Sequence, residues 1–163
     1  MKVLIVSDTH RQNENFVQVV DREEPIDLLI HCGDIEGSEY LISQRAGCPV
    51  YMVAGNNDFF SDLPREKEFQ SGKYKVWLVH GNTYGVSLGN QELKQEARDR
   101  GVDIVMYGHT HKPVVDRDKD LIAINPGSLT YPRQEGRRPS YIVMTIEDGI
   151  RQDVSFEIRY LQE

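Results

Sequence analysis

Cysteine is scarce in this sequence, and long apolar runs are missing. The two cysteines, Cys32 and Cys48, are too few for a disulfide framework and lie in no CxxC or paired His context. Both are expected to be reduced and buried, Cys32 in a packing role. No stretch approaches the roughly 20 apolar residues of a membrane-spanning helix. The apolar start, Val3 to Val6, is too short for a secretory signal, so a cytoplasmic protein without a membrane partner is predicted.

Positive charge is also in short supply. Lys and Arg number 19 against 26 Asp and Glu, a formal net charge of -7. Binding to long nucleic acids depends on basic side chains that neutralise phosphates, so extended nucleic-acid binding is disfavoured. A small phosphorylated substrate remains compatible, because bound cations would cancel part of the negative charge. At 163 residues, the chain is expected to form a single domain over 1–163.

Short apolar runs alternate with helical segments in the first third of the chain, which predicts parallel βαβ units. The predicted strands are 2–6, 27–31, 49–53, 66–70, 74–79, 103–107, 114–117, 121–125, 141–147 and 154–160. The first predicted helix has its apolar face at 16–20 and is capped by Asn13 or Asn15. The other two span 38–46 and about 90–100, and Gly101 ends the last one. The strands after Pro113 are expected to be antiparallel. The expected result is two packed sheets with helices outside.

Short polar motifs follow five of the apolar runs. They are Asp8-Thr9-His10, Gly33-Asp34, Gly55-Asn56-Asn57-Asp58, His80-Gly81 and Gly108-His109-Thr110-His111. In open α/β sheets, the loops beyond the carboxyl ends of strands converge on one edge. Oxygen and nitrogen ligands without a thiolate suit two hard-to-borderline divalent ions better than one structural zinc. The motifs therefore predict metal-assisted hydrolysis.

The spacing within the motifs suggests how the ligands are presented. In an extended stretch, residues i and i+2 point the same way, so Asp8 with His10, and His109 with His111, are expected to face the ions. The glycines at 33, 55, 81 and 108 are expected to permit tight turns. Asp34 is the natural candidate to bridge both ions through its two oxygens. Two carboxylates, a neutral Asn56 and a bridging hydroxide would leave about one net positive charge, which suits a phosphate.

In order and joint presence, these motifs resemble those of the calcineurin-like metallophosphoesterase superfamily. The short chain is similar to its small YfcE-type phosphodiesterase branch, with a resemblance that extends through Asn125-Pro126-Gly127-Ser128. This resemblance implies an α/β fold, a four-layer α/β/β/α sandwich of two mixed sheets flanked by helices. It implies one metal held by Asp8, His10, Asp34 and His111, and a second held by Asp34, Asn56, His80 and His109. The usual ion is Mn²⁺, with Fe, Zn, Ni or Mg as alternatives.

The implied reaction is hydrolysis of a small phosphodiester by in-line attack of a metal-bound hydroxide, with Asp34, Asn56 and His109 as catalytic residues. Asn57 departs from the family pattern, because many members have there a His that is thought to assist the leaving group. An amide cannot act as a general acid near neutral pH, so monoesters with poor leaving groups are expected to be disfavoured. Asn82 is a lesser departure, at a position where many members of the branch have a second His.

Other readings of the same motifs stay open. A phosphomonoesterase, a nuclease or a cyclic-nucleotide phosphodiesterase would use the same metal site. A non-catalytic interaction scaffold is a further alternative, since a retromer subunit shares this fold. The family resemblance also allows a homo-oligomer.

Several polar residues near the motifs have expected roles outside the ligand set. Asp58 is expected to orient a ligand histidine, and His31 to be a buried or interfacial histidine. The loop 125–128 is expected to support the site structurally. Arg133, Arg137 and Arg138 fit a solvated loop or a subunit contact at least as well as a phosphate-binding role.

Overall fold

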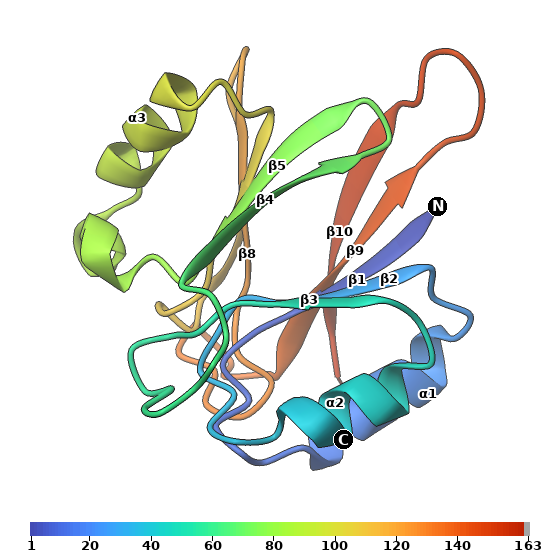
Figure 1. The fold of residues 1–163 in the computed structure, drawn as a ribbon, viewed down its shortest axis with the longest axis vertical. Coiled ribbons are helices and arrows are strands. Elements are labelled where there is room, and N and C mark those ends of the chain that lie inside the picture. The colour runs from blue at the N-terminus through green and yellow to red at the C-terminus, as the bar shows by residue number, and fades with distance from the viewer. Residues whose placement is uncertain (162–163) are drawn as a thin grey trace.

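The computed structural model describes residues 1–161, which form two five-stranded sheets with helices on their outer faces (Figure 1). The first sheet has the order β10-β9-β1-β2-β3. Its strands are β1 (Lys2–Val6), β2 (Leu28–His31), β3 (Val50–Met52), β9 (Ser140–Ile146) and β10 (Val154–Tyr160). The first three strands are parallel and connected by α1 (Glu14–Glu23) and α2 (Glu39–Ala46), which confirms the predicted βαβ units.

The second sheet has the order β4-β5-β6-β8-β7. Its strands are β4 (Glu66–Ser71), β5 (Tyr74–Val79), β6 (Ile104–Met106), β7 (Pro113–Arg117) and β8 (Ile122–Pro126). Two short 3₁₀ turns, η1 (Asn82–Tyr84) and η2 (Val86–Leu88), precede α3 (Gln91–Asp99). The expectation that every strand after Pro113 is antiparallel is wrong for β8, which lies parallel to β6.

The alternation of side chains along the strands creates the layers. In β1, Val3 and Ile5 belong to the core between the sheets, whereas Leu4 and Val6 contact the apolar side of α1 and α2. In β5, Leu78 faces the first sheet and Trp77 belongs to the cluster beneath α3. Each sheet is therefore covered on both faces, as the four-layer α/β/β/α prediction requires.

The predicted side-chain cap of the first helix is wrong. Asn13 occupies the N-cap position of α1, but its amide donates to Ser38 Oγ at 2.9 Å and to the carbonyl of Arg11 at 3.2 Å. Asn15 lies inside the helix and donates to the carbonyl of Leu129 at 2.7 Å. Both amides thus connect the helix to neighbouring loops instead of capping it.

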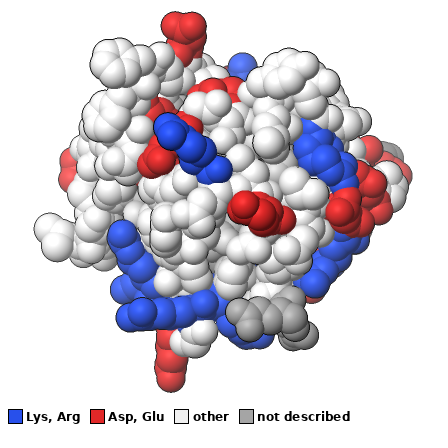
Figure 2. All heavy atoms as spheres, turned by 90° about the horizontal axis from the view of Figure 1, so that it is seen from below, with Lys and Arg blue, Asp and Glu red and all other residues white. Residues whose placement is uncertain are grey.

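The loops that follow β1, β2, β3, β5 and β6 gather at one end of the sandwich, at the lower left of Figure 1. Figure 2 looks at the molecule from below this view and shows acidic and basic side chains in separate small groups among largely uncharged surface. This mixed pattern differs from the basic stripe typical of an extended nucleic-acid interface. No helix within residues 1–161 is long and apolar enough to cross a membrane.

Candidate metal centre

Two groups of potential ligand atoms adjoin at this end of the sandwich. Asp8, His10 and His111 offer atoms that all lie within 4.8 Å of one another, and the same holds for Asp8, Asp34 and His80. His111 Nε2 is 3.1 Å from Asp8 Oδ1, and His80 Nε2 is 3.4 Å from Asp34 Oδ2. Because Asp8 belongs to both groups, the two candidate cation positions are neighbours.

Two of these ligand atoms are buried without a partner. Within residues 1–161, Asp8 Oδ1 and His80 Nε2 are buried and make no hydrogen bond. An unpaired carboxylate oxygen and imidazole nitrogen in the interior are costly, so such atoms need an explanation. A divalent cation between them would provide one. The donor set of carboxylates and imidazoles fits such an ion.

Backbone carbonyls hold two of the imidazoles with one nitrogen facing the centre. His80 Nδ1 donates to the carbonyl of Cys32 at 2.8 Å, and His111 Nδ1 donates to the carbonyl of Tyr131 at 2.7 Å. A carbonyl can only accept, so Nδ1 carries a proton in both rings. Nε2 is then the atom free to bind a cation, an arrangement typical of metal-binding histidines.

A carboxylate holds the third imidazole. His10 Nδ1 lies 2.9 Å from Glu36 Oε1, so its Nε2 also points towards the centre. Glu36 was not predicted from the sequence, because it follows Asp34 by two residues but belongs to no recognised motif. Tyr131 was not predicted either, because it acts through its carbonyl and leaves no trace in a side-chain pattern.

The charges in the centre are strongly coupled. Burial alone would raise the pKa of Asp8, but the nearby imidazoles of His111 and His80 outweigh it and lower this pKa. Burial would likewise raise the pKa of Asp34, yet His80 and two N–H donors of Asn57 lower it. For His80, the neighbouring carboxylates overcome burial and raise the pKa to about 9. A cation bound at His80 Nε2 would therefore displace a proton.

The backbone of the centre is bent where the sequence analysis expected it to be extended. Five of the ten non-glycine residues with positive φ between residues 1 and 161 are predicted ligands: Asp8 (54°), His10 (47°), Asp34 (61°), His109 (71°) and His111 (59°). The extended i, i+2 explanation is therefore wrong. The loops hold these costly conformations by pairing with each other, since the N–H groups of Asp8 and His10 donate to the carbonyls of Gly33 and Asp34, each at 3.0 Å.

The two remaining predicted ligands lie at the rim. Asn56 is exposed, and its Oδ1 is 3.1 Å from Nδ1 of His109. The rings of His109 and His80 are 5.2 Å apart, and burial followed by the charge of His80 lowers the pKa of His109. The structure thus brings all seven predicted ligands to one end of the molecule, five within the two inner groups and two beside them.

The glycines serve this centre in two different ways. Gly33 has a φ of 110°, and a Cβ there would lie 2.6 Å from His80 Nδ1. Gly55 and Gly108 do not have positive φ. A side chain at Gly55 would collide with the Asp34 carboxylate, and one at Gly108 with the Ser7 hydroxyl. At these two positions glycine permits the neighbouring side chain to approach the backbone closely. It does not form the tight turn that was predicted from the sequence.

Asp58 orients backbone and not a histidine, so its predicted role is wrong. Its buried carboxylate accepts N–H groups of Asp34 (2.8 Å), Ile35 (2.9 Å), Glu36 (2.6 Å) and Gly55 (2.7 Å). These donors come from the loops after β2 and β3. Asp58 therefore fixes the segment that presents Asp34.

Three other predictions near the centre are confirmed. Asn125 Nδ2 donates to the carbonyl of Gly108 at 3.0 Å, and Ser128 Oγ donates to that of Asp8 at 2.7 Å, so the 125–128 loop supports the site. His31 is fully buried. Cys32 is fully buried too, and burial raises its pKa well above the ordinary value, as expected for an unreactive packing residue.

Comparison with known proteins identifies the family. The profile of the calcineurin-like phosphoesterase superfamily domain matches residues 1–149. The chain belongs to this superfamily. A probable metallophosphoesterase of Methanocaldococcus jannaschii is 35% identical over 153 residues, covering 92% of this chain and 78% of its own length. A phosphodiesterase of the same organism is 28% identical over 145 residues, covering 78% of this chain and 83% of its own.

Solved structures share the fold. A predicted phosphoesterase from Streptococcus pneumoniae superposes with a TM-score of 0.82 at 25% identity, covering 98% of this chain and 88% of its own. Vps29 from Entamoeba histolytica, in a complex with zinc, superposes with a TM-score of 0.77 at 22% identity, covering 98% of this chain and 99% of its own. The predicted calcineurin-like family and its layered α/β fold are confirmed.

Proposed function

We propose that this calcineurin-like phosphoesterase hydrolyses phosphodiester bonds with two divalent cations, Mn²⁺ being the expected ion and Fe, Zn, Ni or Mg the alternatives. The observation that carries the proposal is the pair of adjoining ligand groups that share Asp8. The unpaired Asp8 Oδ1 and His80 Nε2 support it.

In this proposal one cation is held by Asp8, His10, Asp34 and His111, and the other by Asp34, Asn56, His80 and His109. When bound, two ions would supply a water-derived nucleophile near neutral pH for in-line attack and would offset the negative charge of the phosphate. Asn57 fixes the bridging carboxylate, because its backbone N–H and Nδ2 donate to the two Asp34 oxygens at 2.9 and 3.0 Å. Asn56 and His109 lie at the rim, where we expect the phosphate to approach the centre.

The preference for diesters follows from residue 57. An amide at this position cannot protonate a poor leaving group. The relative named as a phosphodiesterase supports the same substrate class. The alternative of a non-catalytic scaffold is the weaker proposal, because all seven predicted ligands are present and converge.

The test is hydrolysis of bis(p-nitrophenyl) phosphate by the Mn²⁺-loaded protein and its Asp34→Ala variant. Loss of the bridging carboxylate should reduce kcat/KM by far more than about tenfold. Asp148→Ala, at an exposed position between β9 and β10, is the matched control and should keep full activity. Retention of more than about a tenth of the activity by a folded Asp34→Ala protein would contradict the bridging role.

A further inference from the structure

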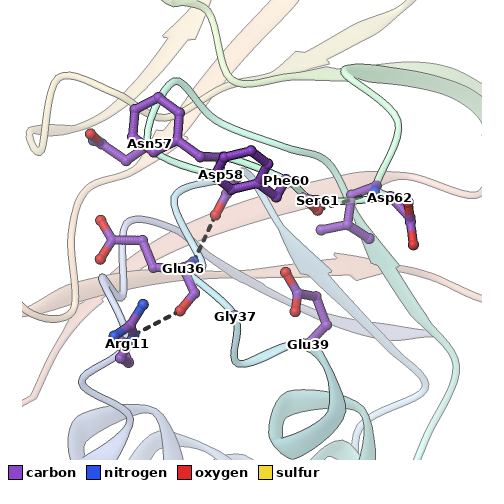
Figure 3. A pocket seen from close by; sticks show the side chains of 11 residues that line it. Arg11, Glu36, Gly37, Glu39, Asn57, Asp58, Phe60, Ser61 and Asp62 are labelled. Atoms are coloured by element: carbon purple, nitrogen blue, oxygen red, sulfur yellow. Dashed lines mark hydrogen bonds between the residues drawn. The ribbon is translucent and has the colours of Figure 1, made fainter.

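A cavity of about 760 Å³ lies beside the candidate metal centre. One wall is the segment 57–63 after β3, and the other consists of Glu36, Gly37 and Glu39, the first residue of α2, with Arg11 at the edge. Figure 3 shows the side chains of Glu36 and Glu39 below the segment that carries Phe60, with Arg11 next to Glu36. The cavity is large enough for a small organic group.

Two of the lining residues also contact predicted metal ligands. Asn57 donates to the Asp34 carboxylate at 3.0 Å, and Glu36 Oε1 lies 2.9 Å from His10 Nδ1. The cavity is thus separated from the centre by single side chains. The cavity therefore adjoins the residues that surround the candidate metal centre.

The walls combine aromatic rings with unpaired negative charge. Phe59 is 73% exposed and Phe60 106%, although phenylalanine is ordinarily buried. Among the described residues, Glu39 and Asp62 have no ion-pair partner. Glu36 adds a third carboxylate, but it already lies 2.9 Å from His10 Nδ1, and Asp58 is occupied by backbone N–H groups. Two unpaired carboxylates therefore remain beside the single guanidinium of the lining. Aromatic faces and carboxylates together attract an organic cation.

Backbone strain extends from the metal centre into this cavity. Arg11 (φ 66°), Glu36 (φ 57°) and Phe60 (φ 59°) are three further non-glycine residues with positive φ. Such conformations cost free energy and cluster at sites that bind ligands. At Phe60 the strained backbone carries a fully exposed ring, which packing does not explain.

We propose that the cavity binds the cationic amino-alcohol arm of a zwitterionic phosphodiester. The proposal rests on the proposed function and names its substrate class. The metal centre takes the phosphate, while the phenyl rings and the carboxylates take an ammonium group a few bonds away. A nucleobase could also stack on the rings, but, being neutral, it would leave Glu39 and Asp62 without a partner.

The test compares two substrates of the same shape: p-nitrophenyl phosphorylcholine and its isostere, in which an uncharged tert-butyl group replaces the trimethylammonium group. The Mn²⁺-loaded protein should favour the choline ester by about tenfold in kcat/KM. This ratio of kcat/KM values should approach one in two double variants, Glu39→Gln/Asp62→Asn and Phe59→Ala/Phe60→Ala, which change only solvent-accessible side chains. In the control Asp148→Asn the preference for the choline ester should persist. Equal turnover of both esters, or a preference that survives both double variants, would overturn the proposal.

A binding measurement separates this proposal from the proposed function. In saturation-transfer NMR with the metal-free protein, choline should show a signal that its tert-butyl isostere lacks and that the Phe59→Ala/Phe60→Ala variant abolishes. If that holds while no diester is hydrolysed, the proposed function fails and the cation site stands. Two results would overturn the proposal. A stronger preference for a p-nitrophenyl ester of thymidine phosphate would assign the cavity to a nucleobase. Self-association that the Phe59→Ala/Phe60→Ala variant abolishes, without any choline signal, would assign it to a second copy of the chain.

Discussion

The position of the proton on each buried imidazole decides what that residue can do. His31 Nε2 lies 3.0 Å from Thr9 Oγ1, and its Nδ1 accepts the N–H of Gly33 at 3.1 Å. His80 has the opposite arrangement, with Nδ1 donating to a carbonyl. The sequence placed His80 in a motif and His31 outside all motifs, and the two rings differ accordingly: both nitrogens of His31 have protein partners, whereas His80 Nε2 has none. It could not predict which ring nitrogen faces the centre, because carbonyls from distant loops determine this.

Burial of neutral His31 predicts acid sensitivity of the metal-free protein. Burial lowers the pKa of His31 from 6.5 to about 4. As pH falls through this window, the unfolded chain binds a proton that the folded protein excludes, so the free energy of unfolding falls, by about 3 kcal/mol in total. In urea titrations between about pH 8 and about pH 4, His31→Gln should lose less stability than the wild type. Parallel curves for the two proteins would contradict this assignment.

Residue 57 predicts the balance between two substrate classes. Asn57→His introduces a group that can protonate a leaving alcohol, so monoester turnover should rise relative to diester turnover by about tenfold or more. The measurement is the ratio of kcat/KM for phenyl phosphate, a monoester with a poor leaving group, and bis(p-nitrophenyl) phosphate with Mn²⁺. An unchanged ratio would show that residue 57 does not determine the preference.

Among the elements, the loops after β2 and β3 form one unit through Asp58. Asp58→Asn keeps the size of the side chain but places an amide against backbone N–H groups that now donate to a carboxylate. The free energy of unfolding should fall by about 2–4 kcal/mol, and the affinity for Mn²⁺ should fall because Asp34 loses its fixed backbone. Urea unfolding and calorimetric titration measure both.

The exposed Asp62 on the same loop provides the control for this prediction. Asp62→Asn should change the stability by no more than about 0.5 kcal/mol. Equal stability and equal Mn²⁺ affinity of the two variants would show that Asp58 does not organise the loops.

Strand positions could be predicted well from the sequence, because buried strands such as β1 and β9 are continuous apolar runs. The direction of each strand relative to its neighbours was harder to predict from the sequence. β8 lies parallel to β6 but antiparallel to β7, and a local pattern does not reveal which strand becomes a neighbour. The bent backbone at Asp8 and His10 was also missed, since tertiary contacts between loops maintain it.

At the scale of the whole molecule, one end of the sandwich contains all the predicted ligands, although they lie up to 103 positions apart in the chain, from Asp8 to His111. The motifs and the family resemblance were enough to predict this meeting. The cavity beside it was not predictable, because exposed phenylalanines and loop carboxylates have no periodic signature. The cytoplasmic location, the lack of an extended nucleic-acid partner and a homo-oligomer stay predictions.

We also propose that the chain folds as a single domain, and the core between the two sheets supports this. Ile5 and Ile30 of the first sheet share one apolar cluster with Leu78 and Met106 of the second. Neither sheet could keep this face buried alone. Thermal unfolding of the metal-free protein should accordingly show one cooperative transition.

The central claim is that two cations bind side by side at the end of this sandwich. A crystal structure of the protein grown with Mn²⁺, with anomalous scattering recorded at the manganese edge, tests it most directly. We expect two peaks about 4 Å apart, with Asp34 in contact with both ions, Asp8, His10 and His111 around one, and Asn56, His80 and His109 around the other. A single peak, or peaks too far apart to share Asp34, would contradict the claim.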